Sequence, residues 1–113
     1  MNNKAQTIQL TDPFGTIVAL AHVRREADFF GGTIDLSATP PALRSLFDEF
    51  EEIVDGQMFS FLDEIQGKMD SLALKAVFET GEAVPVKDLQ VYPCTAEISF
   101  KVADMVAAGN VVP

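Results

Sequence analysis

Residues 40–72 read PPALRSLFDEFEEIVDGQMFSFLDEIQGKMDSL and carry the strongest pattern in the chain. Their apolar side chains recur at steps dominated by three and four, the period of one face of an α-helix. The apolar positions are Leu43, Leu46, Phe47, Phe50, Ile53, Val54, Met58, Phe61, Leu62, Ile65, Met69 and Leu72. Thr39 supplies a capping hydroxyl, and the two prolines after it are tolerated in a first turn. The pattern predicts one long helix over residues 40–72.

The length of this helix conflicts with the size of the chain. A straight helix of 33 residues would be about 50 Å long, whereas a compact domain of this size is roughly 35 Å across. A bend near Gly56, a break into two helices at Asp55-Gly56, or an arm paired with a second copy would each resolve the conflict. Because the apolar stripe keeps nearly one direction past Gly56, we expect a bent but continuous helix.

The sequence on both sides of this helix alternates apolar and polar residues, as β-strands do. We expect strands over residues 7–10, 16–24, 29–36, 74–79, 84–92 and 96–102. A tight turn, Asp12-Pro13-Phe14-Gly15, joins the first two. The order βββ-α-βββ predicts a single α+β domain over residues 1–113: a mostly antiparallel sheet of about five to six strands packed against the long helix. We expect residues 103–113 to fray or to form a short helical turn.

Composition limits the classes of partner. The chain has 17 acidic residues against 8 Lys plus Arg, a net charge of -9 and a pI near 4.3, so nucleic acid and anionic membrane surfaces would repel it. The lone Cys94 has no partner for an intramolecular disulfide, the N-terminal residues lack the pattern of a secretory signal, and no apolar stretch is long enough to cross a bilayer. We therefore expect a cytoplasmic protein.

Most of this negative charge lies in the long helical segment. Residues 40–72 contain eight acidic and two basic residues, a net charge of -6. Asp48, Glu51, Glu52 and Asp55 follow helical spacing, which places them side by side. These four acids have three alternative interpretations: a solvated helix surface, a docking face for a basic partner, or a divalent-metal site. The metal interpretation is the weakest, because hard cations prefer oxygen ligands that converge from loops, and we predict no metal or cofactor.

The docking interpretation predicts a non-enzymatic protein-interaction module, for example one with an inhibitor or immunity-like role. Its predicted partner-binding residues are Asp48, Glu51, Glu52, Asp55, Phe59 and Asp63. Phe59 lies outside the apolar stripe, so either a distortion at Gly56 tucks its ring into the core or a second copy buries it. The second possibility predicts a homodimer.

The alternative function is a small-molecule-binding or catalytic domain with a pocket between sheet and helix. His22, Asp35 and Tyr92 are its candidate residues, since His22 and Tyr92 are the only histidine and tyrosine. Each also has a simpler interpretation: Asp35 precedes a loop that it would cap, and Tyr92 would place its ring in the core and its hydroxyl at the rim. No motif in the chain assigns a catalytic residue.

Overall fold

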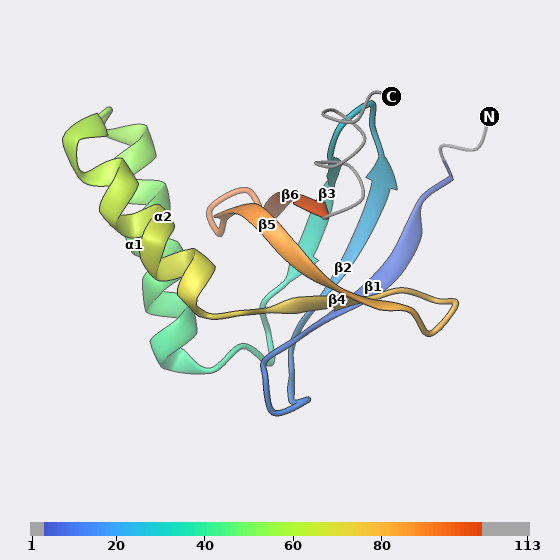
Figure 1. Ribbon diagram of the computed structural model, residues 1–113. Coiled ribbons are helices and arrows are strands. Elements are labelled where there is room, and N and C mark those ends of the chain that lie inside the picture. The colour runs from blue at the N-terminus through green and yellow to red at the C-terminus, as the bar shows by residue number, and fades with distance from the viewer. Residues whose placement is uncertain (1–3, 103–113) are drawn as a thin grey trace, which may run out of the picture.

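The computed structural model describes residues 4–102, which form six strands and a pair of helices joined by a short 3-10 turn (Figure 1). The elements are β1 (Gln6–Thr11), β2 (Ile17–Arg25), β3 (Phe30–Asp35), α1 (Pro41–Asp55), η1 (Phe59–Phe61), α2 (Leu62–Ser71), β4 (Lys75–Val77), β5 (Ala83–Tyr92) and β6 (Glu97–Val102). The strands begin and end within a few residues of the predicted positions. The predicted tail, residues 103–113, lies outside the described residues.

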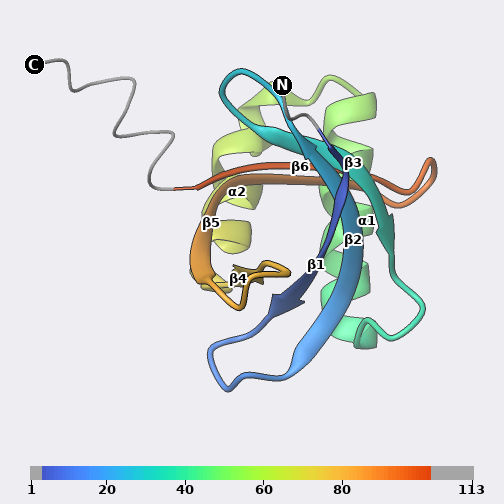
Figure 2. The ribbon, with the colours of Figure 1, turned by 90° about the vertical axis from the view of Figure 1, so that its right-hand side faces the viewer.

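The six strands of residues 4–102 close into a barrel rather than an open sheet. Their order is β1-β2-β3-β6-β5-β4, and β4 pairs back to β1. Every neighbouring pair is antiparallel. Figure 2 looks into this ring of strands, with the two helices behind it. The predicted fold, a sheet packed against one long helix, is therefore wrong, because the sheet closes on itself and the helix is broken.

Closure depends on small side chains that face large ones inside the barrel. Leu10 lies opposite Ala19 on one neighbouring strand and Ala76 on the other, and Ile8 lies opposite Ala21. All five are buried. Because the alanines leave room for the leucine and isoleucine, six strands can wrap around a narrow interior lined by buried apolar side chains.

Gly32 allows the close approach of β3 to β2. A Cβ at this position would collide with the backbone carbonyl oxygen of His22 and lie 2.9 Å from the Cα of Val23. Only glycine therefore fits at this position. A glycine in a strand interior often marks such a tight bend at the corner of a barrel.

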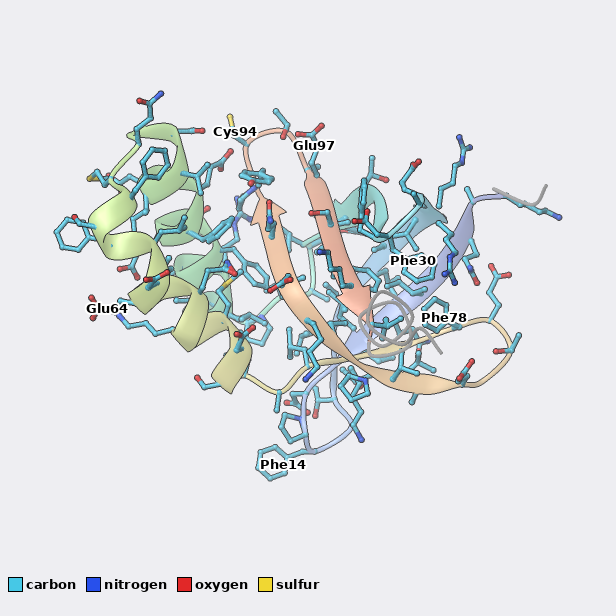
Figure 3. The ribbon with its side chains drawn as sticks, turned by 45° about the horizontal axis from the view of Figure 1, so that its top comes forward. Phe14, Phe30, Glu64, Phe78, Cys94 and Glu97 are labelled. Carbon is cyan, nitrogen blue, oxygen red and sulfur yellow. The ribbon has the colours of Figure 1, made fainter. Side chains whose placement is uncertain are left out.

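The first hairpin has the predicted tight turn. The Asp12 carboxylate accepts hydrogen bonds from the backbone N–H groups of Phe14 and Thr16, each at 2.9 Å. Gly15 adopts a positive φ of 85°, which only glycine adopts without strain. Phe14 at the tip is 91% exposed and points away from the barrel (Figure 3).

The predicted long helix is broken between α1 and η1. Two hydrogen bonds end α1: the Met58 N–H donates to the Ile53 carbonyl and the Gln57 N–H to the Val54 carbonyl, both at 3.0 Å. Gln57 has a left-handed φ of 56°. These features define a Schellman motif, which stops a helix by satisfying its last carbonyl groups.

A continuous helix is therefore wrong, and the break into two helices is the arrangement found. A helix of about 50 Å exceeds the longest dimension of the described chain, 37 Å. The stripe keeps its direction across the break because α1 and α2 bury their apolar sides in the same core. The left-handed position is Gln57 rather than Gly56, so the glycine does not by itself make the turn.

The start of α1 also differs from the prediction. The Thr39 hydroxyl donates to the Val18 carbonyl oxygen at 2.7 Å, and α1 begins without a side-chain cap. Thr39 therefore ties the loop before the helix to the barrel. Pro41 opens the helix, where its missing N–H costs no intrahelical hydrogen bond.

The helix pair covers one end of the barrel and contacts β5 (Figures 1 and 2). Phe47, Phe50 and Ile53 of α1 and Ile65 and Met69 of α2 are buried in one cluster with the barrel interior. Burying a large apolar side chain contributes about 1.5–3 kcal/mol. The helices therefore complete the core that the strands begin.

An aromatic cluster is centred on Phe30, which lies with Phe78 in the part of the barrel away from the helices (Figure 3). The Phe30 ring centroid is 5.3 Å from that of Phe78 and 5.4 Å from that of Phe100. Within residues 4–102, no helix has the length and apolar character needed to span a membrane.

Replacing Gln57 with glycine is expected to stabilise the protein by about 0.5–1 kcal/mol, because the left-handed backbone strains every residue except glycine. Gln66→Gly, the same change inside α2, is expected to destabilise it by a similar amount. Urea denaturation of both variants measures the two effects. A loss of stability in Gln57→Gly would contradict the left-handed connection.

Candidate binding site

Four carboxylates of α1 form one side of the candidate site, which we call the acidic face: Asp48, Glu51, Glu52 and Asp55. They line a shallow, open depression together with Met58 and Cys94, and no basic side chain lines it in the described part of the chain. Figure 3 shows Cys94 in the turn between β5 and β6 and Glu97 at the start of β6, beside the helix pair. The helical spacing therefore brings the four acids together as predicted.

Two contacts hold parts of the acidic face in place. The Cys94 backbone N–H donates to the Glu51 carboxylate at 3.0 Å, which ties α1 to the β5–β6 turn. Arg44 Nε lies 3.4 Å from Asp48 Oδ1, and both side chains are largely exposed. Exposed ion pairs contribute about 0–1 kcal/mol, and the other three carboxylates of the acidic face make no ion pair within residues 4–102.

A groove lies between the helix pair and the outer side of β5 and β6. Its volume is about 620 Å³. Its lining comes from α1, η1, α2, the β2–β3 turn, β5 and β6, and consists of Asp28, Phe29, Phe50, Val54, Phe59, Leu62, Asp63, Gln66, Asp88, Gln90, Tyr92, Ser99, Phe100 and Lys101. Apolar side chains alternate with carboxylates and amides, a mixture suited to orienting a ligand.

The predicted partner-binding residues divide between these two surfaces. Phe59 and Asp63 line the groove, whereas the four α1 acids line the acidic face. Phe59 is 63% exposed, so the interpretation that places its ring in the core is wrong. Phe50 and Val54 of α1 also line the groove, and one helix therefore contributes to both surfaces.

Tyr92 lies in the groove, and carboxylates of the acidic face affect its pKa. Its hydroxyl donates to Gln90 Oε1 at 2.9 Å, and its ring centroid is 5.6 Å from that of Phe50. Burial raises the pKa of Tyr92, and the carboxylates of Asp55, Glu51 and Glu97 raise it further. The negative field of α1 therefore extends into the groove.

The other two residues of the predicted pocket lie elsewhere. His22 Nδ1 is 3.0 Å from Thr7 Oγ1 on the exposed side of β1 and β2. The Asp35 carboxylate accepts the Ser37 backbone N–H at 2.9 Å, and hydrogen bonds from that backbone and from the Ser37 side chain lower the pKa of Asp35. The turn-capping interpretation of Asp35 is confirmed. Neither residue lines the groove with Tyr92.

Of the residues that line the groove, only Phe59, Asp63 and Tyr92 are among the site candidates predicted from the sequence. Asp28 and Phe29 come from a turn, and Asp88 and Lys101 come from neighbouring strands. These residues meet only because the barrel closes and the helix pair folds over β5. One sequence signal for this part of the groove was available. Phe29 and Phe30 are adjacent, so their rings point to opposite sides of the chain and one of them faces away from the barrel interior.

Among residues 4–102, no three His, Cys, Asp or Glu side chains are grouped so that they could hold a metal ion. Comparison of the chain with protein-family models, with characterised proteins and with solved structures finds no match.

The ionisation of Tyr92 tests the electrostatic link between these two surfaces. Tyr92 is the only tyrosine, and the chain has no tryptophan, so the ultraviolet absorbance of tyrosinate reports this group alone. We expect a pKa above the ordinary 10.0. Asp55→Asn should lower the pKa of Tyr92, because it removes a negative charge that repels tyrosinate. Asp48→Asn is the control, since Asp48 is not among the carboxylates that raise this pKa.

The same shift has a consequence for stability. The folded-state pKa of Tyr92 lies above the unfolded value near 10.0. Its contribution to the free energy of unfolding is therefore complete below pH 10 and is lost as pH rises through the folded pKa.

In the titration experiment, a Tyr92 pKa that does not respond to Asp55→Asn would contradict the proximity of the acidic face to the groove.

Proposed function

We propose that this protein is a small interaction module that docks a basic segment of a partner protein on its acidic face, rather than an enzyme. The observation that carries the proposal is the set of four α1 carboxylates that shares its helix with a partly apolar groove. The compartment we propose is the cytoplasm, which the single cysteine favours. An inhibitor or immunity-like role would use such a surface.

Electrostatics supports a basic partner over other classes. The chain carries a net charge of -9, and the acidic face concentrates part of it where no basic side chain of the described residues lines the surface. Complementary charge steers encounter and suppresses partners of the wrong sign. The direction of the Tyr92 pKa shift supports a field that also acts inside the groove.

A second candidate function is the binding of a small molecule in the groove. The observation that favours it is the groove volume of about 620 Å³, within the range of small-molecule sites. Of the three residues predicted for such a pocket, only Tyr92 contributes to the groove. A catalytic version of this function would therefore have to operate without His22 and Asp35.

The double variant Glu52→Lys/Asp55→Lys tests the acidic face. We expect it to weaken binding of a fluorescent oligoarginine peptide by about tenfold, because each exposed charge pair contributes up to about 1 kcal/mol and two charges are reversed. Fluorescence anisotropy at low ionic strength measures the affinity. Added salt should weaken wild-type binding, since exposed charges are screened.

The matched control is Asp70→Lys/Glu82→Lys, which makes the same change in net charge at exposed positions outside the acidic face. We expect it to bind the peptide much as the wild-type protein does. Equal weakening by both double variants would mean that net charge alone attracts the peptide, and the docking face would then be wrong. Circular dichroism confirms that each variant is folded.

The predicted homodimer is the alternative use of the surface around Phe59. The helix break removes the argument from helix length, and the exposed side chains Met58, Phe59 and Phe61 remain as its support. A dimer through this surface predicts a dimeric mass by light scattering at high concentration, and Phe59→Asp would return it to the mass of a monomer. A monomeric wild-type protein would remove the homodimer and leave this surface to a different protein.

A further inference from the structure

The groove combines aromatic side chains with a negatively charged rim. Phe29, from the β2–β3 turn, and Phe59, from η1, are 36% and 63% exposed. Their rings would therefore lose contact with water if an apolar group entered. Such exposed rings beside a concavity are the usual positions for an anchor side chain of a partner.

The charges of the groove favour a cationic occupant. Three carboxylates line it, Asp28, Asp63 and Asp88, against the single cation of Lys101. Lys101 Nζ lies 4.0 Å from Asp88 Oδ2, in an exposed pair. Neither Asp28 nor Asp63 makes an ion pair within residues 4–102. Two carboxylates therefore remain beside the aromatic rings for a guanidinium or an ammonium group, which both carboxylates and aromatic faces attract.

We propose that the groove binds a peptide segment of the partner protein in which an aromatic or branched aliphatic side chain is flanked by arginine or lysine. This inference rests on the proposed function, because the acidic face supplies the attraction for the flanking charges. The apolar side chain enters between the helix pair and β5, where Phe50 and Val54 form apolar lining. The flanking cations meet the rim carboxylates and the adjoining acids of α1.

A second copy of the chain is a poor occupant of this groove. Each copy carries a net charge of -9, so dimerisation here would bring acidic surfaces against the acidic rim. Like charges placed together across an interface cost several kcal/mol. Charge complementarity therefore selects a basic segment of another protein over self-association.

The intrinsic fluorescence of Tyr92 can report binding in the groove. Tyr92 lies in the groove and is the only tyrosine in a chain without tryptophan. The probe is a peptide without tyrosine or tryptophan, with a central Leu-Phe pair flanked on each side by two arginines. Binding in the groove should change the emission of Tyr92. A peptide with a central Ser-Ser pair and the same arginines should bind about tenfold more weakly, because it buries little apolar area.

The neighbouring residues of η1 provide a matched pair of variants. Phe59 lines the groove, whereas Phe61 is 53% exposed and does not line it. Phe59→Ser should abolish the preference for the Leu-Phe peptide over the Ser-Ser peptide. Phe61→Ser should retain that preference. Both side chains are largely exposed, so neither change is expected to unfold the protein.

The outcomes separate this inference from the proposed function. Equal binding of the Leu-Phe and Ser-Ser peptides, with both weakened by Glu52→Lys/Asp55→Lys, would overturn the groove and keep the acidic face. Failure of both cationic peptides to bind would overturn the proposed function and the inference together. A Leu-Phe peptide flanked by glutamates that binds as tightly, an equal effect of Phe59→Ser and Phe61→Ser, or a dimer through Phe59 would each overturn the inference.

Discussion

Pairing of β1 with both β2 and β4 is the constraint on which the rest of the structure depends. It closes the barrel, so that within residues 4–102 the apolar interior is open only at the ends of the ring. The helix pair covers one end. Because the described part of the chain measures 37 Å along its longest axis, a single helix of about 50 Å would extend beyond it, and the segment folds back at Gln57 instead.

The strands could be predicted from sequence, but their closure could not. Period-two alternation identifies a strand that is buried on one side and does not say which edges pair. The information about closure lies in the buried small residues Ala19, Ala21 and Ala76. Their fit against Ile8 and Leu10 can be recognised only once the register of β1 with β2 and β4 is known. Likewise, an unbroken apolar stripe was compatible with two helices, because both helices face one core.

The two halves of the candidate site differ in the same way. The acidic face follows from helical spacing within α1, so a local pattern predicts it. The groove draws on Asp28, Phe59, Tyr92 and Lys101, which are far apart in sequence and belong to different elements. No local period connects them. His22 and Asp35 were candidates because of their residue types, and the register of β2 with β3 places both outside the groove.

Placing charge and apolar surface on one helix gives each a different role in binding. In the docking that we propose, long-range attraction by the acidic face would govern how often a basic segment arrives, and burial of an anchor side chain would govern how long it stays bound. Tyr92 connects the two, since its ring lies against Phe50 in the groove, and burial together with the nearby Asp55 and Glu51 carboxylates raises its pKa. The break at Gln57 brings Phe59 and Asp63 of η1 and α2 to the same groove as Phe50 and Val54 of α1. The feature that lets the helix pair cover the barrel therefore also creates the groove.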